Sequence, residues 1–232
     1  MKILKRLALI LILFTGFAAN SHGETLYSVS MGYYRLSDIF LKEDFGRQQN
    51  GMTFNFTFYY YPKEEAIFGV FFRTSFGTFF SGYEWKDDLE MKPISYYAGG
   101  SDVRLSPAFS YMLRLGKKIR IPFSLGPSFA IYWEEGRDSV FEFGERENKS
   151  YFYESLKLGI LADAALILTP HSRLLGNRFF IKQGISVGWD FLNGEKGNMG
   201  MNYRTVQNNR SKVVPYSAIA LSLYFGIGIS FD

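Results

Sequence analysis

Large apolar residues alternate with small or polar ones along most of this chain, and the alternation recurs in eight separate segments. Because successive side chains of a β-strand point to opposite faces, a period of two predicts strands with one apolar face. No segment after Gly23 shows the period expected of a helix. The segments are 25–34, 51–60, 66–77, 103–114, 119–133, 155–168, 179–191 and a tail that starts near Tyr216.

The length of these segments and the size of their apolar residues favour a membrane barrel. A tilted strand needs about 9–11 residues to cross a bilayer, and each segment is long enough. One face carries Phe, Leu, Ile, Tyr and Trp, and the other carries mostly Gly, Ser, Thr and Ala with scattered charges. Small residues suit the crowded inside of an eight-stranded barrel. A soluble, lipocalin-like cup is the alternative, but it needs more polar residues on its outside than this chain offers.

The connections between the segments alternate in length. Short links on one rim and long loops on the other are typical of outer-membrane barrels. This pattern predicts an antiparallel up-and-down barrel of eight strands with both chain ends on the short-turn, periplasmic side, or of ten strands if a long loop hides another hairpin. The short links are 61–66, 116–118 and 169–177, and the predicted extracellular loops are 35–50, 79–102, 134–150 and 193–213.

The first 23 residues have the features of an export signal. Lys2, Lys5 and Arg6 precede the apolar run Leu7–Ala19, and small residues follow it. Such a run is too short for a spanning helix and fits a signal peptide that is removed. We therefore expect cleavage before Glu24, with cleavage after Ala19 or Ser21 as alternatives, and one barrel domain over residues 24–232. Three of the basic residues behind the formal charge of +4 lie in this signal, so the charge is no indication of nucleic-acid binding.

Eight charged residues fall on the inward face by their parity in the strands. Facing lipid, a basic side chain near the middle of the bilayer costs about 2–4 kcal/mol. Cations outnumber acids in this set, which leaves two interpretations open: a narrow passage that favours anions, or a packed, hydrogen-bonded core without a pore. The residues are Arg73, Arg104, Arg114, Arg120, Lys157, Asp163, Lys182 and Asp190.

Aromatic residues stand near the ends of several strands. Trp133 and Trp189 lie at the predicted loop ends, and Tyr60 and Tyr111 lie near the short turns. Amphipathic rings are stable at the level of the lipid headgroups, so these four residues predict aromatic girdles.

The final strand carries a motif as well as an alternating pattern. Tyr224, Gly226, Ile229 and Phe231 have the spacing of the terminal assembly signal of outer-membrane barrels, although Asp232 follows the last aromatic residue. With this tail the chain resembles the small eight-stranded outer-membrane families, namely the opacity-protein, OmpX-like and OmpW-like barrels. The resemblance implies a bacterial outer-membrane location, contact with outer-membrane lipid, and recognition of the tail by the barrel assembly machinery. We also expect the protein to act as a monomer.

No catalytic constellation is visible in the sequence. There is no cysteine, and His22 and His171 are the only histidines, one in the signal and one in a short turn. Metal, phosphate-loop and dinucleotide motifs are absent, so we expect no enzyme and no cofactor. Long loops on a rigid scaffold commonly carry binding. We therefore expect a structural or adhesion-type role through an extracellular ligand or host surface, with a narrow channel for small solutes as the alternative.

Overall fold

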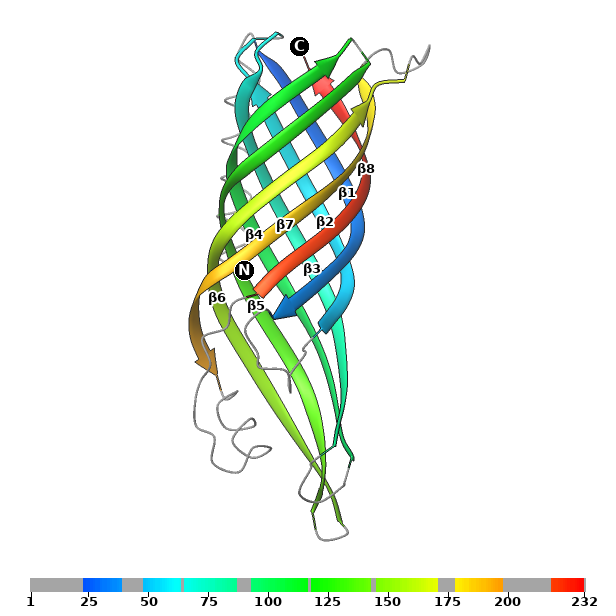
Figure 1. Ribbon diagram of the computed structural model, residues 1–232, viewed down its shortest axis with the longest axis vertical. Helices are drawn as coiled ribbons and strands as arrows, with labels where there is room; N and C mark the ends of the chain where they lie inside the picture. The colour runs from blue at the N-terminus through cyan, green and yellow to red at the C-terminus, as the bar shows by residue number, and fades with distance from the viewer. Residues whose placement is uncertain are drawn as a thin grey trace.

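The protein is a closed, antiparallel barrel of eight β-strands in the order of the sequence (Figure 1). The computed structural model describes residues 23–38, 48–63, 65–86, 93–116, 118–142, 145–170, 178–197 and 218–231. The predicted fold class is confirmed, and the described part contains eight strands rather than ten. They are β1 (Glu24–Asp38), β2 (Gln48–Tyr61), β3 (Phe68–Lys86), β4 (Pro93–Leu115), β5 (Ile119–Glu142), β6 (Glu145–Leu168), β7 (Phe179–Gly197) and β8 (Ala218–Phe231).

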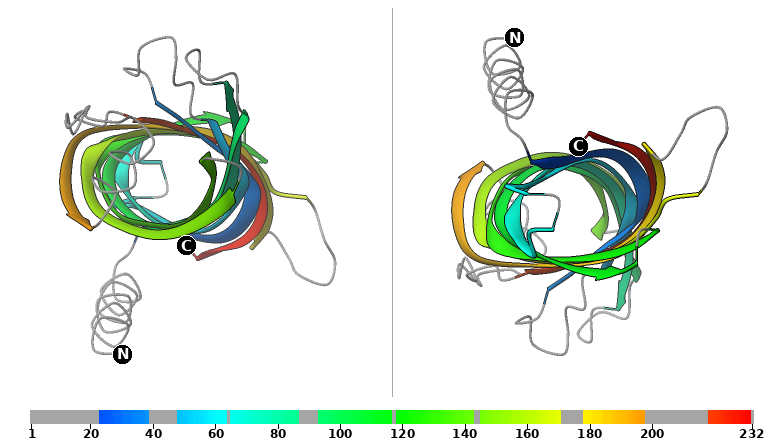
Figure 2. Two further views of the ribbon diagram at one scale, coloured as in Figure 1. Left: turned by 90° about the horizontal axis from the view of Figure 1, so that it is seen from below. Right: turned by 90° about the horizontal axis from the view of Figure 1, so that it is seen from above.

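Every strand pairs with its neighbours in the sequence, and β1 pairs with β8 to close the ring (Figure 2). Thr25 at the start of β1 lies opposite both Tyr60, next to the short β2–β3 link, and Phe231 at the end of β8. The first and last strands therefore begin and end at the short-turn rim, as the even strand number requires. At this rim Gly116 adopts a positive φ of 75° in the link between β4 and β5, a conformation that glycine adopts readily.

The outer surface of the barrel is apolar. Val29 is 60% exposed, Phe109 is 81% exposed and Leu125 is 61% exposed, although each is a large hydrophobic residue. Exposed residues of this kind occur on all eight strands. A continuous apolar band that surrounds a closed barrel matches the lipid-facing surface of a membrane-spanning barrel. None of the described residues forms a helix long and apolar enough to cross a membrane.

The strands are longer than the sequence predicted, and two of the predicted loops are mostly strand. The segment 134–150 was expected to be a loop, but β5 and β6 pair as far as Glu142 and Glu145. Likewise β3 and β4 pair as far as Lys86 and Pro93, inside the predicted loop 79–102. The alternating pattern fades in the sequence of these parts, and a sheet without one buried face does not require alternation. Backbone pairing continues without it.

The lumen also differs from the expectation of small inward residues. A cluster of large side chains fills its short-turn half, and it includes aromatic rings that the sequence pattern did not lead us to expect there. An eight-stranded barrel is wide enough only for its own side chains, so these residues pack against one another across the ring. The cluster consists of Leu26, Tyr59, Tyr61, Phe71, Met112, Leu161, Ile167 and Phe180.

Candidate functional site

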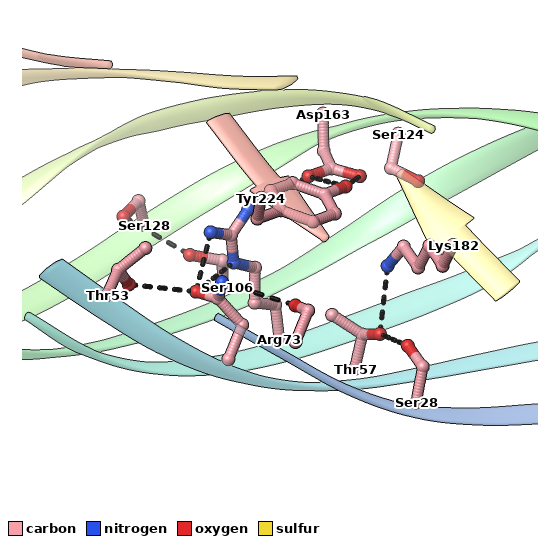
Figure 3. A network of polar contacts seen from close by, with 12 residues as sticks. Ser28, Thr53, Thr57, Arg73, Ser106, Ser124, Ser128, Asp163, Lys182 and Tyr224 are labelled. Carbon is pink, nitrogen blue, oxygen red and sulfur yellow. Dashed lines mark hydrogen bonds and ion pairs between the residues drawn. The ribbon is translucent and has the colours of Figure 1, made fainter. Parts of the chain in front are cut away.

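The centre of the lumen holds a network built around Arg73 of β3. Its guanidinium lies 2.9 Å from the carboxylate of Asp163 on β6 and donates to Asn55 Oδ1 at 2.6 and 3.1 Å (Figure 3). Tyr224 of β8 donates its hydroxyl to the same carboxylate at 2.8 Å. Arg73 and Asp163 are both buried. Their pairing explains how two charges are tolerated inside the membrane-spanning part of the barrel.

Lys182 of β7 lies beside this network and is fully buried. Its ammonium donates to Thr57 Oγ1 at 2.9 Å, and Thr57 is hydrogen-bonded in turn to Ser28 (Figure 3). The ammonium also lies 4.8 Å from the ring centre of Tyr59 and 5.0 Å from that of Tyr224. Cation–π contacts of this kind stabilise a desolvated cation, so the inward tyrosines hold this charge in place of a carboxylate.

A second group of charges lies toward the long-loop end. Arg104 of β4 makes two parallel hydrogen bonds of 2.7 Å to Asp190 of β7 and a third of 2.8 Å to Ser128. Its Nε is 3.7 Å from Asp102 Oδ2. The β6–β7 ladder shifts register between Leu158 and Gly159, and Gly159 pairs with Asp190. β-Bulges commonly redirect a side chain, and this one lies where Asp190 faces the lumen.

Lys157 of β6 is buried in the same part of the lumen, with its ammonium 3.9 Å from the ring centre of Tyr132. The Tyr132 ring stacks on Phe79 with a centroid distance of 5.1 Å and an interplanar angle of 13°. These stacked rings offer the ammonium an electron-rich face.

A third group of charges closes the short-turn end. Glu24 accepts from Arg114 at 2.6 Å and also pairs with Arg120. Arg120 donates to Thr169 Oγ1 at 2.8 Å, and Arg114 donates to the carbonyl oxygen of Ala66 at 2.5 Å. The side chain of Arg114 is 22% exposed, so it lies at the barrel mouth rather than inside. The Glu24 carboxylate of β1 thus connects this strand to β4 and β5 through two ion pairs.

Two carboxylates of the lumen were missing from the residues selected from the sequence. Glu24 stands just before the first alternating segment, and Asp102 just before the fourth, so both fell outside the segments that were used to assign parity. Glu24 lies an even number of residues from the inward Ser28, and Asp102 lies two residues from the inward Arg104. This parity is the sequence signal that places both carboxylates on the inward face. With these two acids included, the described lumen holds six cations and four carboxylates.

A small cavity remains between the Arg73 and Arg104 groups. Its volume is about 20 Å³, which is enough for about one water molecule. Its lining residues are Tyr34, Thr53, Arg73, Ser75, Asp102, Arg104, Leu161, Ser186, Ala220 and Ser222. The apolar cluster and the charge pairs on either side of it are almost fully buried, and this packing resembles a protein core more than a passage.

The residues predicted for the girdle and the assembly signal lie in different surroundings. Trp189 is 43% exposed and Tyr111 is 40% exposed on the outer face, while Trp133 and Tyr60 are half-buried. Ile229 and Phe231 also face outward. Tyr224 faces the lumen, as its bond to Asp163 requires, and Gly226 is buried. Headgroup-level placement and recognition of the tail stay predictions.

No group of His, Cys, Asp and Glu that could hold a metal ion occurs among the described residues. His171 lies outside those residues, together with the rest of 171–177 in the predicted link 169–177. Also outside are residues 1–22, residues 39–47 of the predicted loop 35–50 and residues 198–213 of the predicted loop 193–213. The described lumen residues form ion pairs and hydrogen bonds, and these interactions stabilise the buried charges.

The comparisons with known proteins concern structure alone, because no family model and no curated protein matches the sequence. A major outer-membrane protein from Thermus thermophilus matches with a TM-score of 0.51 and 13% identity, over 89% of this chain and 99% of that one. OprG from Pseudomonas aeruginosa matches with a TM-score of 0.47 and 12% identity, over 91% and 97%. Ail, the attachment invasion locus protein of Yersinia pestis, matches with a TM-score of 0.40 and 20% identity, over 90% and 99%, in a complex with the heparin analogue sucrose octasulfate.

The Thermus likeness supports the fold, and the apolar outer band and charged lumen of this chain support it independently. The chain has the fold of the small eight-stranded outer-membrane barrels, with an apolar outer surface that fits a membrane.

Proposed function

We propose that the protein is a plugged outer-membrane anchor that presents a β-sheet at the cell surface for adhesion to an extracellular ligand or host surface. The observation that carries this proposal is the unequal length of the strands. β5 and β6 contain 24 residues each, whereas β2 and β8 contain 14. Since about 9–11 residues span the bilayer, the longest strands extend well beyond it, at the end away from the short turns (Figure 1).

The extension has two edges without a described partner strand. The β2–β3 ladder ends at Asn50 and Phe80, so residues 81–86 of β3 pair only with β4. The β6–β7 ladder ends at Tyr153 and Gly197, so residues 145–152 of β6 pair only with β5. Unpaired strand edges accept an extended segment of another protein through main-chain hydrogen bonds. The extended sheet therefore has a means of binding that does not depend on a pocket.

The two edges differ in sequence. Residues 145–150 of β6 read ERENKS, with four charges in six residues, whereas residues 81–86 of β3 read SGYEWK, with two. Charged side chains on an edge oppose strand addition. The β3 edge, with fewer charged residues in its sequence, is therefore the better candidate for contact with a partner.

The packed lumen favours an anchor over a channel, and no catalytic role is part of the proposal. We further propose that the barrel is a monomer, that its tail is read by the barrel assembly machinery, and that the signal is removed before Glu24. Cleavage at that point retains the carboxylate that pairs with Arg114 and Arg120, whereas cleavage one residue later would remove it.

Shortening each extended hairpin tests the adhesive role. One variant removes residues 82–97 and joins Ser81 to Ala98 through an Asn-Gly turn, and the matched variant removes 137–150 and joins Gly136 to Tyr151. Both cuts are made between directly paired residues, so the register of the barrel below is retained. We expect the first variant, displayed on a non-adherent bacterium, to lose most adhesion to epithelial monolayers, and the second to lose less. Full adhesion by both folded variants would contradict the proposal.

A further inference from the structure

We infer that Arg35, on the outer face of β1, binds the phosphate group of a lipid in the outer leaflet of the membrane. This inference rests on the membrane location in the proposed function, but it concerns the wall of the barrel rather than the extended sheet. It is drawn from the direction and height of the Arg35 side chain, from its unpartnered donor, and from the residues beside it on the outer wall.

The Arg35 side chain points away from the lumen. Tyr34 is buried and donates its hydroxyl to Asp102 inside the barrel, whereas Tyr33 is 47% exposed on the outer face. Successive side chains of a strand alternate between the two faces, so Arg35 follows Tyr33 outward. The other charged strand residues whose side chains the structure describes face the lumen or its mouth. Among them, Arg35 is the one charge on the outer wall.

The height of Arg35 matches the boundary of the outer leaflet. Thr25 lies at the short-turn rim, opposite Phe231, and Arg35 follows it ten residues later toward the long-loop end of β1. A strand rises about 3.4 Å per residue, so the two residues are about 34 Å apart along the strand. With the tilt of about 35–45° of such barrels, their vertical separation is about 25 Å, which is the height of the apolar band. Arg35 therefore lies at the level of the lipid headgroups.

Arg35 has a donor without an acceptor. Its Nε is buried and makes no hydrogen bond, and no ion pair joins its guanidinium to any other described residue. Buried N–H groups are almost always hydrogen-bonded. A guanidinium is a planar fork of five N–H donors that matches the oxygen atoms of a phosphate. A phosphate at headgroup level therefore supplies the acceptors that the described side chains do not.

Asn50 of β2 adds a second donor at the same place. It lies directly opposite Arg35 in the β1–β2 ladder and is exposed. Its Oδ1 accepts a hydrogen bond from the Tyr33 hydroxyl, so the Nδ2 group of the same amide is left to donate. Two donor groups next to an amphipathic ring on the outer wall are suited to the headgroup region, where one side of each residue meets lipid and the other meets polar groups.

The surroundings of Arg35 favour a lipid over a free phosphate ion. Leu221 of β8 lies opposite Arg35 on its other side. Further toward the middle of the wall, on the same face, Leu223 is 51% exposed and Met31 is 49% exposed. A lipid whose phosphate lies at Arg35 places its acyl chains against this apolar surface, and burial of that surface adds to the binding energy. A free ion gains only the polar contacts.

Native mass spectrometry of the refolded protein, titrated with diphosphoryl lipid A in dodecyl maltoside, tests the site. We expect one lipid to bind more tightly than all others. Arg35→Gln should raise the half-saturating concentration of that lipid by at least about tenfold, as expected for one lost charge-assisted hydrogen bond. Asn50→Ala should raise it less. Lys63→Gln is the matched control, because it removes an exposed cation next to the short β2–β3 link and should leave binding unchanged.

Two further ligands separate the sources of phosphate. Dephosphorylated lipid A should bind the wild-type protein no better than lipid A binds Arg35→Gln, and inorganic phosphate should compete only at concentrations far above that of the lipid. Wild-type binding of the dephosphorylated lipid would overturn the inference. Competition by inorganic phosphate at the concentration of the lipid would also overturn it, because the site would then take a free ion.

Two results with Arg35→Gln would overturn the inference as well. One is lipid A binding equal to that of the wild type. The other is a lower unfolding midpoint in dodecyl maltoside without lipid, because Arg35 would then be held by a partner within the protein. Failure of the refolded wild-type protein to insert into lipid vesicles would be a different result, since it would contradict the proposed membrane anchor itself.

Discussion

At the scale of single residues, specific side-chain partners stabilise the charges inside the barrel. Arg73 is paired with Asp163, Arg104 with Asp190, and Lys182 with the rings of Tyr59 and Tyr224. Removing one member of a buried pair leaves an unpaired charge, which is more costly than removing both. The network therefore predicts strong coupling between its members.

Asp163→Asn tests this coupling. We expect it to lower the free energy of unfolding by about 3–5 kcal/mol, because it leaves Arg73 charged and without its carboxylate. The double variant Arg73→Gln, Asp163→Asn should recover a substantial part of that loss. Urea titrations of the folded barrel in lipid vesicles measure both values. Additive losses in the double variant would show that the two side chains do not interact.

Parity within a strand predicted the inward placement of these charges, but it could not predict their partners. Arg73 and Asp163 stand on β3 and β6, which are not neighbours in the ring. Which charges meet across the lumen depends on the stagger of the strands around the barrel, and that stagger is not written in any single segment. Tyr224 shows the same limit, because its place in the tail motif gave no indication of its bond to Asp163.

At the scale of the elements, the ladder between β4 and β5 is interrupted. Its register runs to Leu105 and Phe129 and resumes at Phe109 and Leu125. Continuing that register places Pro107 directly opposite Pro127, and neither has an N–H to donate. The pairing of each proline with its other neighbouring strand continues, to Phe72 on β3 and to Ile160 on β6.

We therefore expect this seam to open more readily than the rest of the wall. Hydrogen exchange should be faster at Phe109 and Phe129, whose amides flank the prolines on the same seam, than at Arg73 and Thr74, which lie on the intact β3–β4 side. Pro107→Val should slow exchange at the seam by restoring one donor. Amide exchange measured by mass spectrometry in nanodiscs checks both expectations. Equal protection on the two sides of β4 would contradict them.

The strands themselves were predictable because lipid on one side and a narrow lumen on the other enforce alternation. The ends of the strands were not predictable, because the alternation weakens there. In residues 134–150 the sequence shows no regular alternation, so it does not distinguish a paired hairpin from a loop, although β5 and β6 pair as far as Glu142 and Glu145. Backbone hydrogen bonds hold these residues in register regardless of which side chains they carry.

At the scale of the whole molecule, the lumen is divided into a charged centre, an apolar cluster and a base closed by Glu24. The described lumen side chains of all three parts are almost fully buried. We expect the refolded protein to produce no discrete conductance steps in a planar bilayer, with a 16-stranded porin as the positive control. A boiling-dependent gel shift verifies that the silent protein is folded. Regular steps with anion preference would instead support the channel alternative.

The ion pairs also connect parts of the chain that are far apart in sequence. Arg73 and Asp163 are separated by 90 residues, Arg104 and Asp190 by 86, and Glu24 and Arg120 by 96. None of these pairs lies within a single hairpin, so each depends on strands that are not neighbours in the sequence. A strand placed out of register would leave several of these charges unmatched inside the membrane. The ion pairs therefore select for the correct order and register of the whole ring, because only that arrangement brings every charge to its partner.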